Sequence, residues 1–200
     1  MREIGLIKQV QVQRSSLKAG QQPHSYYDPA PLLVVPGLRP TGEGVIGITA
    51  TGEQVIDVHN SEHPASRQRA GRNGISIGFT SHYRTMRARF GPHLVDGIAG
   101  ENILVETERK QALTSLEHGI VIKSAATGQF VYLTNVIVAT PCVPFSQFAA
   151  NRQDLADKEL KHVLQFLDKG TRGFYTTLAG GQQATTIAAG DRIFALQEEV

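Results

Sequence analysis

The sequence predicts a mainly β fold, a β-barrel with a few helices. Short apolar stretches bounded by glycine, proline, asparagine or serine recur along the 200 residues, and such a series of short strands is typical of a barrel. In the segments 80–90 and 152–169, apolar residues recur every three or four positions, which predicts two helices. There is no internal repeat and no linker between two units, so we expect residues 1–200 to form a single domain.

The expected strands follow from alternating or continuous apolar runs. Residues 3–13 carry apolar side chains mainly at even positions, which predicts a first strand with one buried face. Glycine turns at Gly52 and Gly128 each separate two apolar stretches, so we expect a hairpin at both places. The full set of expected strands is 3–13, 32–35, 45–48, 54–58, 74–79, 102–105, 118–124, 129–138, 173–178, 184–188 and 192–196.

Capping residues set the expected ends of the two helices. Ser81 and Asn151 are the expected N-caps, because their side chains can accept a hydrogen bond from a free backbone N–H group. Gly170 is the expected C-cap of the second helix. Residues 15–31 are polar and rich in proline and glycine, which predicts a loop.

The composition indicates a folded globular protein with an ordinary charge balance. Hydrophobic residues make up 40% of the chain, and the net charge of +2 is too close to zero to predict a nucleic-acid partner. A single cysteine fits a reducing compartment. The sequence has neither a signal peptide nor the roughly 20 apolar residues of a membrane helix. We therefore expect a cytoplasmic protein without a membrane partner.

Cys142 is the first candidate for chemistry. It follows the apolar run 130–138 and lies between Pro141 and Pro144, which predicts a stiff loop that aims the thiol. One interpretation is a small buried hydrophobic residue. The others are a thiolate nucleophile, a sulfur carrier or a soft metal ligand. These need a positive neighbourhood, because a free thiol has a pKa of about 8.5.

A block of positive charge between Glu62 and Asp96 could supply that neighbourhood. The block contains no carboxylate. Guanidinium groups bind phosphate or carboxylate in pairs of hydrogen bonds, so an anion site is one interpretation. A solvated helix face is another, and RNA binding is a third that the shortage of aromatic residues disfavours. The arginines of the block are Arg67, Arg69, Arg72, Arg84, Arg87 and Arg89.

Three further patterns carry weaker signals. Residues 59–63 match the metalloprotease pattern H-x-x-E-H, but Pro64 disfavours the helix that this motif requires, so we interpret the match as chance. A looser metal site with Asp57, His59 and His63 is an alternative. The turn at 97–102 could present the Asn102 amide to a ligand or be a plain turn. Arg172, between two glycines after a helix, could reach a ligand or interact with the helix dipole.

Taken in order, these segments resemble the MOSC domain, the C-terminal domain of molybdenum cofactor sulfurases and its stand-alone relatives. The resemblance covers about residues 45–196. Its motifs are Gly100-Glu101-Asn102, the hairpin at Gly128, Pro141-Cys142, the helix up to Lys169, the segment Gly170-Thr171-Arg172-Gly173-Phe174 and the final Gly190-Asp191.

The resemblance implies a MOSC-like β-barrel in which Cys142 binds the molybdenum of a pterin cofactor or carries sulfur as a persulfide. From their chemistry and position, we assign Arg67, Arg84 and Arg172 to the cofactor phosphate. Asn102, Thr140 and His59 complete the expected cofactor-binding set. One departure concerns a His-Gly-Gly stretch of many relatives, which corresponds here to His59-Asn60-Ser61. If these glycines allow close approach of the backbone to the cofactor, their loss puts the affinity for the cofactor in doubt.

Three functions are compatible with this resemblance. The first is an oxidoreductase that uses the cofactor to reduce N-hydroxylated small substrates. The second is a carrier that passes cofactor or sulfur to a partner, and the third is a MOSC fold that has lost the cofactor. The first two predict a small-molecule ligand together with a redox or sulfur-transfer protein partner.

Overall fold

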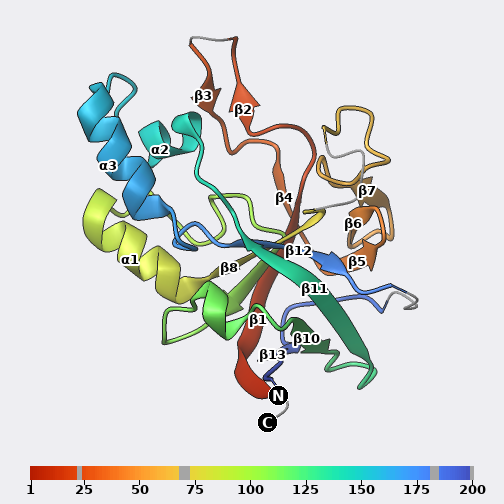
Figure 1. Ribbon diagram of the computed structural model, residues 1–200. Helices are drawn as coiled ribbons and strands as arrows, with labels where there is room; N and C mark the ends of the chain where they lie inside the picture. The colour runs from red at the N-terminus through yellow and green to blue at the C-terminus, as the bar shows by residue number, and fades with distance from the viewer. Residues whose placement is uncertain (22–23, 68–72, 181–184, 199–200) are drawn as a thin grey trace.

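Across the residues that the computed structural model describes (1–21, 24–67, 73–180 and 185–198), seven β-strands close into a mixed barrel. The strands are β1 (Arg2–Gln13), β8 (Ile75–Phe79), β9 (Ile103–Glu106), β10 (Ile120–Lys123), β11 (Phe130–Val138), β12 (Phe174–Leu178) and β13 (Arg192–Ala195). Their order is β13-β10-β11-β12-β8-β9-β1, and β1 pairs again with β13 (Figure 1). The β8–β9 pair is parallel and the other neighbours are antiparallel. The predicted fold class is confirmed.

The long strand β1 holds the barrel closed. It pairs with β13, with β9 and, outside the barrel, with β4 (Leu32–Val35). Its register shifts between Glu3 and Gly5 and again between Ile7 and Gln9. Such irregularities bend a strand and increase its twist, so that one strand can pair with several neighbours around the curved barrel wall.

Two apolar cores lie on either side of the barrel wall. The interior of the barrel is filled by β-branched and other apolar side chains, such as the fully buried Val12, Ile77 and Leu133. A second core, with Tyr83 and Phe145 at its centre, lies between the helices and the barrel. Those helices are α1 (Thr80–Phe90), α2 (Val143–Ala149) and α3 (Asp157–Leu167).

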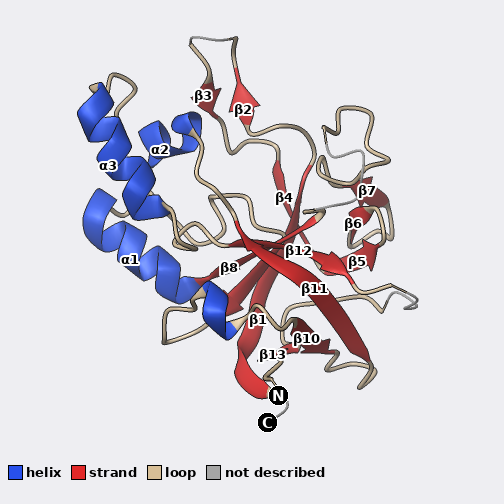
Figure 2. Ribbon diagram, viewed as in Figure 1, coloured by secondary structure: helices blue, strands red, loops and turns tan. Residues whose placement is uncertain are grey.

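The helices lie together on one side of the barrel, and a small sheet lies on the opposite side (Figure 2). That sheet consists of β5 (Gly37–Thr41), β6 (Gly44–Ile48) and β7 (Gln54–Ile56). A short 3-10 helix covers Leu113–Ser115. Within the described residues, no helix is long and apolar enough to cross a membrane.

The segment 15–31, expected to be a loop, contains a short hairpin in its described part. Its strands are β2 (Lys18–Ala19) and β3 (Tyr26–Tyr27). The ring of Tyr27 packs 5.1 Å from that of Phe145 in α2, and its hydroxyl donates to the carbonyl of Ile98 at 2.7 Å. These contacts hold the hairpin against the helical side of the molecule.

Several expected boundaries were wrong. Helix α2 was not expected, and the second expected helix, 152–169, is the shorter α3. The N-caps are Phe79 and Ala156 rather than Ser81 and Asn151. The C-cap of α3 is Asp168, two residues before Gly170. Of the expected strand 184–188, Ala184 lies outside the described residues, and Ile187 makes an isolated bridge to Leu38.

Candidate functional site

A cavity of about 240 Å³ lies beside the β2–β3 hairpin, where the loop 57–67 meets the β11–α2 connection and the start of β12. Its described lining includes five of the seven residues expected at the site. These are Cys142, Thr140, His59, Arg67 and Arg172. Segments far apart in the sequence therefore bring a thiol, a hydroxyl, an imidazole and two guanidinium groups to one hollow.

The backbone before α2 positions the thiol of Cys142. This residue is the N-cap of α2, with extended backbone angles (φ −108°, ψ 158°), and its carbonyl accepts from the N–H of Ser146 at 2.9 Å. Pro144 is the second residue of α2, where a proline needs no hydrogen-bonded N–H group. The Cys142 side chain is half-buried and lines the cavity. It can therefore contact both protein and ligand.

Arg172 supplies a fixed positive charge beside the thiol. Its Nη2 donates to the carbonyl of Ala99 at 3.0 Å, and its guanidinium carbon lies 5.4 Å from the centre of the Phe145 ring. The buried Nε has no hydrogen bond to any described residue. Burial lowers the pKa of Arg172, but the negative charges that Tyr175 and neighbouring groups can carry raise it by more. The net effect is a pKa above the usual value of an arginine. One donor of this permanent cation thus remains free.

Glu101 interacts electrostatically with Arg172 but does not line the cavity. It is fully buried, and burial raises the pKa of its carboxyl group although the hydroxyl of Tyr83 donates to Oε2 at 2.6 Å. Gly78 faces it, and a Cβ at that position would lie 2.6 Å from Oε1. The glycine therefore leaves the space that the buried acid occupies.

Three permanent cations line the cavity, and no acid lines it among the described residues. Arg67 and Lys18 are exposed, whereas Arg172 is largely enclosed. This charge distribution favours an anionic ligand. Lys18 was missed by sequence reasoning, because nothing in the polar segment 15–31 marks it as a site residue.

The structure does not bring Asn102 or Arg84 to the cavity. Asn102 is buried next to β9, where Oδ1 accepts from the backbone N–H and the hydroxyl of Ser76, and Nδ2 donates to Asp57. Its amide is therefore used inside the protein. Arg84 lies on α1 and donates to the carbonyls of Thr107 and Glu108.

The arginine block is dispersed rather than gathered into one anion site. Arg87 forms an ion pair with Asp96 at 2.7 Å, and Arg89 lies over the ring of Phe166. Arg69 and Arg72 fall outside the described residues. Within the described part, Arg67 is the member of the block that lines the Cys142 cavity.

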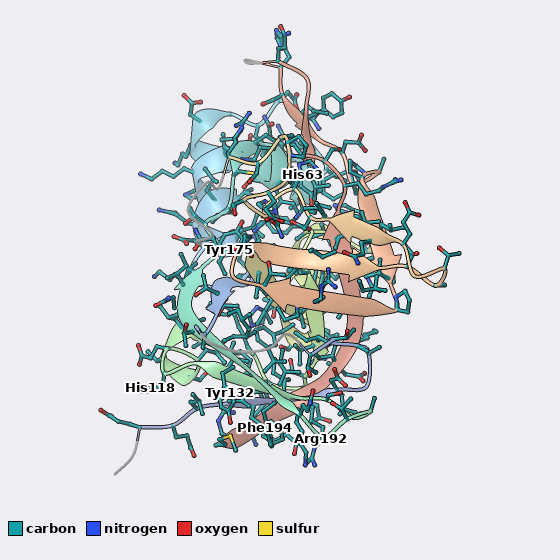
Figure 3. The ribbon with its side chains drawn as sticks, turned by 90° about the vertical axis from the view of Figure 1, so that its right-hand side faces the viewer. His63, His118, Tyr132, Tyr175, Arg192 and Phe194 are labelled. Carbon is teal, nitrogen blue, oxygen red and sulfur yellow. The ribbon has the colours of Figure 1, made fainter. Side chains whose placement is uncertain are left out.

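The H-x-x-E-H segment has no helix, as Pro64 predicts. Residues 59–66 form turns, and the Nδ1 of His63 accepts from the N–H of Ala65 at 3.1 Å. Figure 3 shows His63 in the upper part of the view, above Tyr175. Among the described residues, no group of three or more His, Cys, Asp or Glu side chains is arranged to hold a metal ion.

Asn60 and Ser61, where the sequence comparison expected a pair of glycines, leave the cavity open. Asn60 is buried, and its Oδ1 accepts from the N–H of Glu62 at 2.9 Å. The N–H of Ser61 donates to the carbonyl of Glu43. Neither residue belongs to the lining of the cavity. The loss of these glycines therefore does not fill the space beside Cys142.

Comparisons with known proteins support the fold. No protein-family model and no curated protein matches the sequence. Among solved structures, the YUAD protein from Bacillus subtilis is similar, with a TM-score of 0.54, 14% identity and coverage of 94% of this chain and 93% of that chain. A hypothetical protein is similar with a TM-score of 0.54, 11% identity and coverage of 99% of this chain and 72% of that chain. At these identities the similarity shows the fold alone.

Proposed function

We propose that this protein binds a molybdenum-pterin cofactor in the Cys142 cavity, with the Cys142 thiolate as metal ligand or sulfur carrier. One observation carries the proposal: a half-buried thiol shares a cavity with three permanent cations and with no acid from the described residues. The barrel fold and the ordered MOSC-like motifs support the same proposal.

The chemistry of the lining fits such a cofactor. A thiolate is a soft ligand that suits molybdenum, and guanidinium and ammonium groups suit a phosphate. The guanidinium group of Arg172 is part of the cavity lining and can donate to a bound anion. Asn60 and Ser61 leave the cavity open. Cys142 would supply one thiolate, and the cofactor would bring the remaining metal ligands.

Each residue then has a distinct task. Arg172 places a fixed positive charge in the same cavity as the thiol and can bind an anionic group of the ligand. Lys18 and Arg67, both exposed, attract and hold the phosphate end of the ligand. The hydroxyl of Thr140 offers a donor next to the thiol. When bound, the cofactor supplies the redox chemistry.

Within this proposal, the first candidate function is that of an oxidoreductase. It would reduce N-hydroxylated small substrates with electrons from a redox protein partner in the cytoplasm. A carrier of cofactor or sulfur is the second candidate. The partial exposure of Cys142 favours the carrier function, because a thiol that passes a group to another protein has to be accessible to that protein. Turnover with an electron donor would separate the two.

The first test is metal analysis of protein purified anaerobically from a host that makes the cofactor, wild type beside Cys142→Ser. We expect molybdenum in the wild type and a loss of about tenfold or more in the variant, because a serine hydroxyl is a poor substitute for a soft thiolate.

Thr140→Ala is the matched control, since it changes the same loop and leaves the thiol. It should retain most of the metal. If wild-type protein contains no molybdenum although the host has cofactor to spare, the ligand proposal is wrong. A persulfide on Cys142, detected by mass spectrometry, would then support the carrier.

A further inference from the structure

Arg172 lines two different spaces in the structure. One is the Cys142 cavity, and the other is a narrow enclosed space that Arg172 shares with Glu101, Ser76 and Tyr175. The narrow space has no room for a water molecule. The buried acid and the cation of the cavity therefore adjoin the same dry region of the protein.

A series of hydrogen bonds fixes these two charged groups relative to each other. The hydroxyl of Tyr83 donates to Oε2 of Glu101 at 2.6 Å and accepts from the backbone N–H of Ala99 at 2.9 Å. The carbonyl of the same Ala99 accepts from Nη2 of Arg172 at 3.0 Å. One tyrosine and one backbone residue thus connect the carboxyl group with the guanidinium group.

Glu101 and Arg172 influence each other electrostatically and not through a direct hydrogen bond. Oε1 of Glu101 and Nε of Arg172 are both buried, and neither makes a hydrogen bond to a described residue. Burial raises the pKa of Glu101, whereas Tyr83 and the positive charge of Arg172 act in the opposite direction. In a dry environment the charge of such a carboxyl group acts strongly on its neighbour.

We propose that Glu101 sets the affinity of the Cys142 cavity for an oxyanion by acting through Arg172. With Glu101 protonated, Arg172 presents an uncompensated positive charge to the cavity. With Glu101 ionised, part of this charge is compensated, and the carboxylate repels the ligand. An anion bound beside Arg172 therefore favours transfer of a proton from solvent to the Glu101 carboxylate.

The inference deepens the proposed function, on which it rests for the class of ligand, a phosphate or similar oxyanion. Glu101 does not line the Cys142 cavity, so it is a positioning residue that reaches the ligand through another side chain. The anion affinity of the cavity should then fall as the pH rises through the pKa of Glu101.

Other titratable or charged groups surround the pair, and the test has to separate them from Glu101. Around Glu101 these groups are Tyr83, Asp96, Arg172 and Tyr175. In the Cys142 cavity they are Lys18, Tyr27, His59, Arg67 and Cys142. Glu101→Gln leaves all of them in place, and its amide oxygen can still accept from Tyr83. The difference between this variant and the wild type therefore isolates Glu101.

The test uses the full chain from a host that cannot make the cofactor and measures its affinity for inorganic sulfate between pH 5 and 9 by calorimetry. Sulfate keeps both negative charges over this range, so any pH dependence comes from the protein. Over the range, we expect the wild type to lose about threefold to tenfold more affinity than Glu101→Gln. Buffers of different ionisation enthalpy should show a maximal uptake of about half a proton or more per sulfate beyond that of Glu101→Gln.

Glu106→Gln is the matched control, because it makes the same change at an exposed residue that lines neither space. Its pH profile should follow that of the wild type. Equal profiles in the wild type and Glu101→Gln overturn the inference, as does a wild type that shows no saturable binding of sulfate. Because these measurements need no molybdenum, their outcome is distinct from the metal analysis that tests the proposed function.

A second measurement covers the case in which Glu101→Gln does not fold. Carbon-13 NMR of the wild type follows the side-chain carboxyl group of Glu101 through a pH titration. Saturating sulfate should move its pKa upwards, because a bound anion disfavours the carboxylate. A pKa that is the same with and without bound sulfate overturns the link between Glu101 and the cavity.

Discussion

At the scale of single residues, His82 links stability to pH. It is buried between Phe79 and Phe174, and its Nε2 accepts from the backbone N–H of Gln111 at 3.0 Å. Burial, with help from Lys110, lowers the pKa of His82 from 6.5 to about 4. The folded protein therefore holds this ring neutral at a pH where the unfolded chain protonates it.

The stability that His82 contributes is complete above pH 6.5 and is lost as the pH falls towards 4. Across this window we expect His82 to account for a loss of about 3 kcal/mol in the free energy of unfolding. In His82→Gln the side-chain carbonyl can still accept from Gln111, but nothing titrates. Urea unfolding between pH 4 and 8 should show a flatter acid limb in the variant.

The comparison has to be made between variant and wild type, because Glu101 acts in the opposite direction. Burial raises the pKa of Glu101, so the folded state retains its proton and stability falls as the pH rises above about 4.5. This contribution is the same in both proteins and cancels in the difference. Equal acid slopes in the two proteins would contradict the role of His82.

At the scale of elements, helix α3 begins without a capping side chain. Its N-cap is Ala156, which is exposed and has the extended backbone of a normal N-cap (φ −62°, ψ 150°). Glu159 already accepts from the Ala156 N–H at 3.2 Å, which is one half of a capping box. Ala156 itself has no acceptor for the free N–H groups of the first turn.

Ala156→Ser should complete the box and stabilise the protein by about 1 kcal/mol. For a domain of this size, that corresponds to a rise in Tm of about 2–4 °C. Ala126→Ser is the control, because Ala126 is exposed in the turn between β10 and β11 and caps no helix. Thermal denaturation compares the three proteins, and an unchanged Tm in Ala156→Ser would contradict the capping argument.

Elements with a strong local pattern could be predicted from the sequence, and elements that depend on tertiary contacts could not. The range of α1, 80–90, was predicted correctly because its apolar spacing and Gly91 define it. Helix α2 was missed because Pro141 and Pro144 suggested a loop, although a proline is compatible with the first turn of a helix. Its apolar face is defined by packing against Tyr27 from another segment.

The same distinction applies to the candidate site. Cys142 and Arg172 could be predicted because neighbouring glycines and prolines mark their turns. The buried position of Asp57 could not be predicted, because its hydrogen-bond partners Gln13 and Asn102 are distant in the sequence. Arg84 was assigned to the site by charge alone, and charge does not specify where a side chain points.

At the scale of the whole molecule, closure of the barrel depends on how closely β1 approaches its neighbours. A Cβ at Gly5 would lie 2.1 Å from the carbonyl oxygen of Glu106, a backbone atom of β9 that cannot rotate away. Gly5→Ala should therefore force the two strands apart and destabilise the protein by about 1–3 kcal/mol. Urea unfolding at neutral pH measures the change.

Gly42→Ala is the matched control for this prediction. Gly42 lies in the turn between β5 and β6, and a Cβ there would meet nothing within 4 Å. We expect its unfolding free energy to stay within about 0.5 kcal/mol of the wild type. If the two alanine variants were equally stable, close packing at Gly5 would not limit closure of the barrel.

The pairing of β1 with β13 also has a consequence for biosynthesis. Arg2 lies opposite Ala195, so strand β1 needs a partner strand that is translated long after it. While the ribosome adds the intervening residues, at about 5–20 per second, β1 can pair with β4 and β9 but not with β13. The nascent chain therefore exposes an open sheet edge until β13 emerges, and this is the stage at which a chaperone would protect it.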